Sequence, residues 1–209
     1  MNYHKINTVF KRDEEGRLLE GEWTHSEFEY LKLANWQGTE KVDGMNIVLT
    51  LSGDNLRITG RTENAQIPAQ LSENINATFA IDVIAKIHKT FNNRTVTMYG
   101  EGYGPKIQSG GKYGEEQDFV LFDVLISEKY FLCRKDVEAF GKAFGIKVVP
   151  ILREGTLLSM IDVIKSRELK SSWGDFLPEG LVLRPKVEMR TQAGERIITK
   201  LKHKDFITR

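Results

Sequence analysis

The chain has 209 residues, of which 40% are hydrophobic and 28% are charged, and these values suit one soluble globular domain. No apolar run approaches the roughly 20 residues that a membrane helix requires, so no membrane helix is expected. The opening segment Met1-Asn2-Tyr3-His4-Lys5 has no apolar stretch behind it, unlike a signal peptide. The single cysteine, Cys133, cannot form an internal disulfide and follows Phe131 and Leu132. We therefore expect a buried thiol and a cytoplasmic location.

The net charge is only +1, but positive charge is concentrated near the carboxyl end of the chain. From Arg184 onward, eight Lys and Arg residues stand against three acidic residues, which gives this segment +5 and leaves −4 for the rest. Such clustering is typical of a phosphate-binding surface. Lysines also protect exposed edge strands from pairing, so charge alone leaves both interpretations open.

The first regular elements are expected after residue 44. Two alternating segments, 45–51 and 55–60, are separated by Ser52-Gly53-Asp54 and predict a β-hairpin. Apolar residues then recur at helical spacing and predict one helix over residues 72–91, with Ser72 as its N-cap.

Further strands and shorter helices alternate through the rest of the chain. The strands are expected over residues 95–101, 119–126, 130–133, 147–152, 181–184 and 196–202. A helix over residues 135–144 should end at Gly145, and Thr156 should cap another helix that contains Leu157 and Ile164. Antiparallel strands with inserted helices indicate an α+β fold of two packed sheets, with residues 1–209 as a single domain.

The segment Glu40-Lys41-Val42-Asp43-Gly44 indicates covalent chemistry when it is taken with the motifs that follow it. A lysine amine attacks only when neutral, and its usual pKa of about 10.4 makes this cost roughly 4–5 kcal/mol at neutral pH. Burial and nearby cations lower that cost. Lys200 and Lys202 are suitable cations because residues two apart share one face of a strand. Attack on a nucleotide α-phosphate would then release pyrophosphate, with lysines and Mg²⁺ stabilising the phosphate charge.

In their order, the motifs resemble those of the covalent nucleotidyltransferases, which include ATP-dependent DNA and RNA ligases and messenger-RNA capping enzymes. The similarity is greatest to the phage-type RNA ligases and extends over nearly the whole chain. It is carried by Phe28-Glu29-Tyr30-Leu31, Thr39-Glu40-Lys41-Val42-Asp43-Gly44, Tyr99-Gly100-Glu101-Gly102-Tyr103-Gly104-Pro105-Lys106-Ile107-Gln108, Glu179-Gly180-Leu181-Val182-Leu183-Arg184-Pro185 and Gly194-Glu195-Arg196-Ile197-Ile198-Thr199-Lys200-Leu201-Lys202. The resemblance implies an ATP-grasp-like nucleotidyltransferase domain without an OB-fold domain.

The resemblance also implies a role for each matched residue. Lys41 would carry the AMP, and Lys200 and Lys202 would hold and polarise the α-phosphate. Glu40 and its neighbouring backbone would contact adenine, and Asp43 would shape the turn beside the nucleotide. For Glu40 the alternative is a solvated side chain, and for Asp43 it is a plain Asp-Gly turn.

Four more residues receive roles in the same way. Arg61 would bind the sugar or phosphate region, and Glu101 would bind the ribose hydroxyl. Phe119 would stack on adenine, although an aromatic residue in an apolar strand is usually part of the core. Glu179 would support the catalytic metal, Mg²⁺ or Mn²⁺.

Other basic residues are weaker candidates, and for each a solvated side chain is an equal alternative. Lys106, Arg184 and Lys186 could contact phosphate or RNA. DNA ligases and capping enzymes orient the leaving pyrophosphate with a basic motif in their OB-fold domain, and this sequence shows no such domain. Lys5, Lys11 and Arg12 could substitute for that motif.

The implied reaction has three steps: AMP transfer from ATP to Lys41, AMP transfer to a 5′-phosphate end, and attack by a 3′-hydroxyl. The implied partner is nucleic acid with such ends, RNA preferred, and the expected form is a monomer without membrane association. A DNA ligase and a capping guanylyltransferase are alternative enzymes. A nucleic-acid-binding module without catalysis is the alternative from another class.

Overall fold

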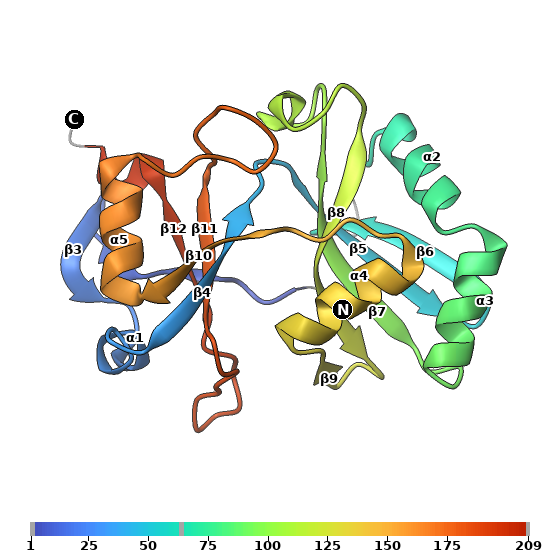
Figure 1. Cartoon of the computed structure of the whole chain (residues 1–209), viewed down its shortest axis with the longest axis horizontal. Coiled ribbons are helices and arrows are strands. Elements are labelled where there is room, and N and C mark those ends of the chain that lie inside the picture. The colour runs from blue at the N-terminus through green and yellow to red at the C-terminus, as the bar shows by residue number, and fades with distance from the viewer. Residues whose placement is uncertain (1–2, 63–64, 208–209) are drawn as a thin grey trace. The chain divides into compact units, whose positions relative to one another are not determined.

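The computed structural model describes residues 3–62 and 65–207, and it contains sheets with helices in an α+β arrangement (Figure 1). The contacts divide the chain into two compact units. Unit 1 comprises Met1–His4 and Asp43–Val149, and unit 2 comprises Lys5–Val42 and Pro150–Arg209. In the described part of the chain, no helix is both long and apolar enough to cross a membrane.

A five-stranded antiparallel sheet forms the centre of unit 1. Its order is β6 (Asn55–Gly60), β5 (Met45–Ser52), β7 (Val96–Tyr103), β8 (Asp118–Ile126) and β9 (Tyr130–Phe131). The predicted hairpin is confirmed, since β5 and β6 pair from Ile47 with Gly60 to Ser52 with Asn55.

Three helices of unit 1 contribute to one apolar core with this sheet: α2 (Ala69–Thr78), α3 (Ile81–Thr90) and α4 (Arg134–Phe144). The prediction of one helix over 72–91 is wrong, because the backbone leaves the helical conformation at Phe79 and Ala80. Phe79 is buried in the core, so packing of this side chain outweighs continuation of the helix. Helix α2 also begins before Ser72, directly after Pro68.

Residues 130–149 differ from the prediction in two ways. Cys133 is exposed rather than buried, because it is the N-cap residue of α4, and its thiol donates to Asp136 Oδ2 at 3.1 Å. Helix α4 does end at Gly145, whose φ of 69° is the left-handed conformation expected there. The strand predicted over 147–152 is confirmed only at Ile151 and Leu152, where strand β10 (Ile151–Thr156) begins, and Val148 makes an isolated bridge to Leu121 in unit 1.

A second five-stranded sheet forms the centre of unit 2. Its order is β1 (Asn7–Thr8), β12 (Thr199–Lys202), β11 (Gly180–Pro185), β4 (Asn35–Lys41) and β10 (Ile151–Thr156). Strands β1 and β12 are parallel, and the other neighbours are antiparallel. A separate hairpin is formed by β2 (Phe10–Arg12) and β3 (Leu18–Trp23).

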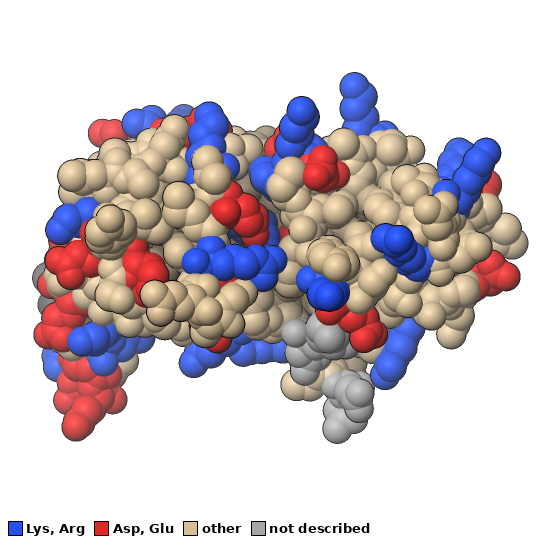
Figure 2. Space-filling view, turned by 90° about the horizontal axis from the view of Figure 1, so that it is seen from below, with Lys and Arg blue, Asp and Glu red and all other residues tan. Residues whose placement is uncertain are grey.

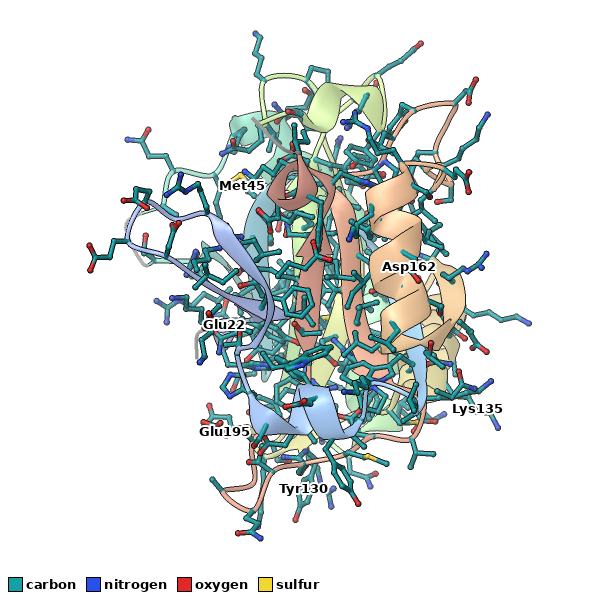
Figure 3. The ribbon with its side chains drawn as sticks, turned by 90° about the vertical axis from the view of Figure 1, so that its left-hand side faces the viewer. Glu22, Met45, Tyr130, Lys135, Asp162 and Glu195 are labelled. Carbon is teal, nitrogen blue, oxygen red and sulfur yellow. The ribbon has the colours of Figure 1, made fainter. Side chains whose placement is uncertain are left out.

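Helix α5 (Leu157–Ser166) lies alongside the strands of this sheet. Its residue Asp162 is labelled in Figure 3. Thr156 caps it as predicted, since its hydroxyl accepts a hydrogen bond from the Ser159 amide at 3.1 Å. The buried apolar residues of α5 belong to one core with Trp36, Leu181 and Leu201. Two short elements complete the unit: α1 (Ser26–Tyr30) and the 3₁₀ helix η2 (His203–Phe206).

Candidate active site

Three lysines share one face of the unit 2 sheet. Lys41 of β4 and Lys202 of β12 are both paired with Gly180 on the strand between them, and Lys200 is paired with Val182. Paired positions on neighbouring strands point to the same face. The predicted common face of Lys200 and Lys202 is therefore confirmed, and Leu201 lies in the core on the opposite face.

Gly180 makes this row possible. A Cβ atom at this position would meet the carbonyl oxygen of Leu201, so the close approach of β12 requires glycine. Because Gly180 has no side chain, nothing stands between the stems of Lys41 and Lys202 in that row.

Glu179 joins two of the lysines. Its Oε2 atom lies 2.6 Å from Lys41 Nζ, and its Oε1 atom lies 2.6 Å from Lys202 Nζ. Burial alone would raise the pKa of Glu179, but the charge of Lys41 and the hydrogen bond from Lys202 outweigh it and lower the pKa. The carboxylate therefore stays ionised and holds both amines in place.

Lys200 differs from the other two lysines. Burial, followed by the positive charges of Lys202 and Lys41, lowers the pKa of Lys200 to about 8. Within residues 3–62 and 65–207, no ion pair involves Lys200. At neutral pH this amine is mostly protonated, so the site keeps a positive charge that a phosphate oxygen could neutralise.

On the face shown in Figure 2, Lys and Arg side chains are interspersed with Asp and Glu side chains. Several basic residues counted at the carboxyl end are paired in this way, among them Lys186, whose Nζ lies 2.7 Å from Glu154 Oε2. The net charge of a sequence segment is thus a poor guide to its surface. The face that carries Lys41, Lys200 and Lys202, called the lysine face below, is distinguished by the charge of Lys200, which no ion pair among the described residues neutralises. The total charge of the segment does not distinguish it.

Glu40 lies on the other face of β4 from Lys41, with only 2% of its surface exposed. Ser171 Oγ donates to its Oε1 at 2.6 Å, and Oε2 accepts from the Ser172 amide at 3.0 Å and hydroxyl at 3.2 Å. The side chain therefore secures the loop that follows α5, and the structure does not bring it together with the lysines. Alternation along β4 is the physical reason.

Glu101 and Phe119 point to opposite faces of the unit 1 sheet. Glu101 is paired with Val120, whereas Phe119 is paired with Gly102, whose Cα faces Leu71 of helix α2. Phe119 is 5% exposed and belongs to the core. This is the position of a core residue, and it does not support stacking of Phe119 on adenine beside Glu101.

Phe122 is the second phenylalanine of β8, and its position in an apolar strand predicts a core residue. It is half-buried and packs on the sheet face that carries Tyr99 and Val48. The register between β7 and β8 shifts at the step from Tyr99 to Gly100, where Phe122 falls. Because nearly all residues of β8 are apolar, the sequence does not show which of them point to which face of the sheet. The register shift is also not visible in the sequence.

The remaining predicted residues of unit 1 lie in loops. Asp43 lies two residues after the last residue of β4, and its backbone N–H donates to the hydroxyl of Tyr113 at 3.3 Å. Sequence reasoning gave Tyr113 no role. A Cβ atom at Gly44 would meet the carbonyl oxygen of Gly102, so this turn requires glycine. Arg61 is exposed directly after β6.

Glu179 is a candidate ligand for a metal ion. In the described parts of the chain, no group of three or more His, Cys, Asp or Glu side chains could hold a metal ion. Mg²⁺ commonly binds through one or two carboxylates together with substrate phosphates and water. Glu179 beside the lysines fits that limited role, since it offers one ionised carboxylate where phosphates would be attracted.

Comparison with protein-family models gives a match to the RNA ligase model over residues 34–202. The chain belongs to the RNA ligase family. The matched range includes Lys41, Glu179, Lys200 and Lys202, so the lysine face lies inside the RNA ligase region. A search of curated protein sequences finds no match.

Solved structures of an RNA ligase from Naegleria gruberi have the same fold. A variant solved with ATP and Mn is 22% identical, with a TM-score of 0.66 over 86% of this chain and 54% of that chain. A second variant with ATP and Mn is 19% identical, with a TM-score of 0.70 over 98% and 59%. The enzyme with PPi is 21% identical, with a TM-score of 0.66 over 96% and 61%. The chain thus spans 54% to 61% of the length of these relatives.

Proposed function

We propose that this chain is the adenylyltransferase domain of an ATP-dependent RNA ligase, which joins 3′-hydroxyl and 5′-phosphate ends through AMP attached to Lys41. Membership of the RNA ligase family supports this proposal. The observation that carries it is the arrangement of Lys41 and Lys202 on the two oxygens of Glu179, each at 2.6 Å. Lys200 lies on the same face.

In the first step, the Lys41 amine attacks the α-phosphorus of ATP. A nitrogen–phosphorus bond forms, the bond from the α-phosphorus to its bridging oxygen breaks, and pyrophosphate leaves with that electron pair. The ammonium proton of Lys41 is lost to solvent. Lys200 and Lys202 stabilise the charge that develops on the phosphate oxygens. A metal ion held with help from Glu179 would supply further positive charge to these oxygens.

In the second and third steps, AMP moves from Lys41 to a 5′-phosphate end, and a 3′-hydroxyl then displaces it. Each step is a transfer at phosphorus, so one set of lysines can serve all three. The related Naegleria enzyme has been solved with ATP and Mn, which supports ATP and a divalent metal, Mg²⁺ or Mn²⁺, as the requirements of this chain.

The roles of the unit 1 residues stay predictions within this proposal. Glu101, Arg61 and Asp43 are proposed to take part in nucleotide binding, as the family resemblance implies. Phe122 replaces Phe119 as the candidate for stacking on the base, because Phe122 packs on the same face of the sheet as Tyr99. We also propose that residues 1–209 act as one catalytic domain, that the protein is a cytoplasmic monomer, and that RNA is preferred.

Intact mass measured before and after incubation with ATP and Mg²⁺ tests the proposal. The unmodified protein should gain the mass of one AMP, and Lys41→Ala should gain none. GTP in place of ATP tests the guanylyltransferase alternative, and nicked RNA against nicked DNA tests the strand preference. Unmodified protein that binds RNA without gaining AMP would instead be a binding module.

A further inference from the structure

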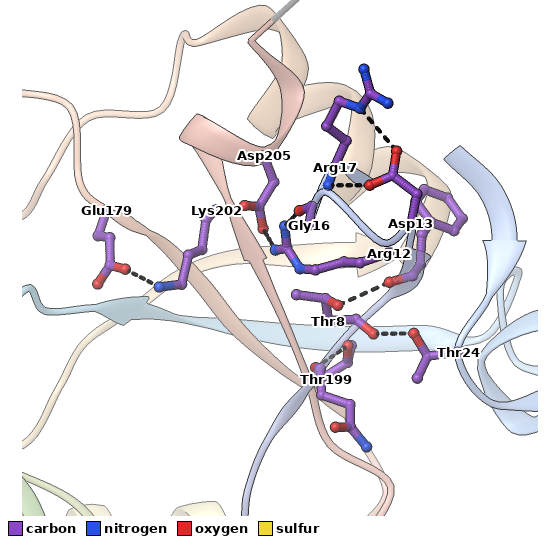
Figure 4. A network of polar contacts seen from close by, with 12 residues as sticks. Thr8, Arg12, Asp13, Gly16, Arg17, Thr24, Glu179, Thr199, Lys202 and Asp205 are labelled. Carbon is purple, nitrogen blue, oxygen red and sulfur yellow. Dashed lines mark hydrogen bonds and ion pairs between the residues drawn. The ribbon is translucent and has the colours of Figure 1, made fainter. Parts of the chain in front are cut away.

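A fourth cation joins the lysine face from a distant part of the sequence. Strand β1 runs parallel to β12 and pairs Thr8 with Lys200. Four residues later, at the end of β2, Arg12 reaches the 3₁₀ helix that follows β12, where its Nη2 atom lies 2.7 Å from Asp205 Oδ2. Figure 4 shows this ion pair in one view with the bond between Lys202 and Glu179.

Two bonds hold the Arg12 guanidinium in place, and its other N–H donors are available to a ligand. Nη1 donates to the Gly16 carbonyl at 2.8 Å, and Nη2 bonds the Asp205 carboxylate, whose side chain is only 6% exposed. A guanidinium has five N–H donors in a planar fork, so these two bonds fix its plane and leave further donors. The side chain of Arg12 makes no other hydrogen bond or ion pair with the described residues.

Charges around this face do not balance without an anion. The cations are Lys41, Lys200, Lys202 and Arg12, and the carboxylates that bind them are Glu179 and Asp205. Two positive charges are left over, and the charge of Arg12 is one of those that disfavour the protonated form of Lys200. A phosphate group placed among these cations would neutralise the excess.

Strand order indicates which phosphate this would be. From Lys41 on β4, the sheet continues through β11 and β12 to β1. Arg12 follows β1 in the chain and contacts Asp205 after β12, so it lies beyond Lys200 and Lys202 on the side away from Lys41. Transfer at phosphorus places the leaving group opposite the attacking atom. A cation on the side away from the Lys41 amine is therefore suited to the leaving group.

We propose that Arg12, with Lys200, binds the β- and γ-phosphates of ATP and stabilises the pyrophosphate that leaves when AMP is transferred to Lys41. The inference rests on the proposed function and adds a residue outside the region matched by the RNA ligase family model. Arg12 takes no part in sealing an RNA end that already carries AMP, since no pyrophosphate leaves in that step.

Two half-reactions separate this role from a general one. Self-adenylylation is followed by intact mass with ATP and Mg²⁺, and sealing is followed with RNA whose 5′ end was adenylylated chemically. Arg12→Ala should slow self-adenylylation by about 10- to 100-fold, the range expected for loss of one hydrogen bond to a charged group. Sealing of the adenylylated RNA should change less than about twofold. The reverse reaction of AMP-loaded protein with pyrophosphate should need more pyrophosphate in this variant.

Matched controls guard against a purely structural effect. Arg17→Ala removes another cation of the same hairpin, whose side chain is 74% exposed and lies 2.9 Å from Asp13, and it should leave both half-reactions unchanged. Asp205→Asn removes the ion pair but keeps the charge of Arg12, and it should retain self-adenylylation within a few-fold.

Three outcomes would overturn the inference. Arg12→Ala could slow both half-reactions equally, Asp205→Asn could slow self-adenylylation as much as Arg12→Ala, or Arg12→Ala could behave like the unmodified protein. Each is distinguishable from failure of the proposed function, in which the unmodified protein itself gains no AMP.

Discussion

Glu40 and Glu179 are both largely shielded from solvent in unit 2, but different kinds of groups bind their carboxylates. Glu40 accepts hydrogen bonds from Ser171 and Ser172, which are neutral and belong to one loop. Glu179 is bound by two lysine amines. A neutral donor has little to gain from a phosphate, whereas an ammonium group can exchange one anion for another. The first carboxylate therefore maintains the structure, and the second is suited to chemistry.

The largest expected effect comes from Glu179→Gln. The change keeps the shape of the side chain but removes the charge that holds Lys41 and Lys202. Self-adenylylation should fall by about 100-fold or more, because electrostatic groups of a transition state have effects of this size. Intact mass over time measures the rate, and a thermal melt should show that the variant is folded. Adenylylation at the normal rate would remove the distinction drawn between the two carboxylates.

Glu40→Gln should lower the stability of the protein and leave AMP attachment nearly unchanged. Its amide offers one acceptor oxygen in place of two, so either the Ser171 hydroxyl or the Ser172 N–H loses the oxygen that accepts its hydrogen, at a cost of about 1–3 kcal/mol of unfolding free energy. The melting temperature should drop by roughly 2–4 °C for each kcal/mol lost. AMP attachment per folded molecule should stay within a few-fold.

The matched control for Glu40→Gln is Ser172→Ala, which removes only the 3.2 Å hydroxyl bond and should cost less stability. If Glu40→Gln instead abolished AMP attachment with no change in melting temperature, the carboxylate would act on the nucleotide after all. That result would restore the role in adenine binding implied by the family resemblance.

A smaller, pH-dependent effect is expected at Lys200, which shares its face with Lys41, Lys202 and Glu179 and feels the charge of Arg12. Its pKa of about 8 means that the amine is charged below this pH and neutral above it. Loss of this charge should lower the kcat/KM for ATP in self-adenylylation above pH 8, by up to about tenfold per pH unit relative to Lys200→Arg, because the Lys41 amine gains reactivity with pH equally in both proteins. Lys200→Arg keeps its charge and should move the decline to higher pH. Identical profiles for both proteins would assign the decline to another group.

Glu154→Gln should have the smallest effect. This carboxylate is exposed and paired with Lys186 at 2.7 Å, and that contact lowers the pKa of Glu154. Solvent screens such pairs, so neither the melting temperature nor the adenylylation rate should change measurably. A clear loss of activity would mean that the groups that bind a carboxylate and its burial do not distinguish a functional carboxylate from a structural one.

Local signals in the sequence predicted several elements correctly. The turn residues Ser52-Gly53-Asp54 marked the β5–β6 hairpin, Gly145 marked the end of α4, and Thr156 marked the start of α5. These features depend on a few neighbouring residues, so they can be recognised without the rest of the fold. Strands β1, β2, β3 and β4 were not predicted, because their pairing partners lie far away in the chain or their patterns are short.

The sequence by itself determined the order of the motifs, and thereby the family resemblance, and the common face of Lys200 and Lys202, since both depend on spacing along one segment. Tertiary structure alone decided which carboxylate meets the lysines, because register across β4, β11 and β12 places Glu179 with them and Glu40 on the opposite face. It also decided that Phe119 is a core residue and brought Arg12 to the carboxyl-terminal 3₁₀ helix. Pairing between distant strands sets these positions, and a shift of one residue would exchange the two faces.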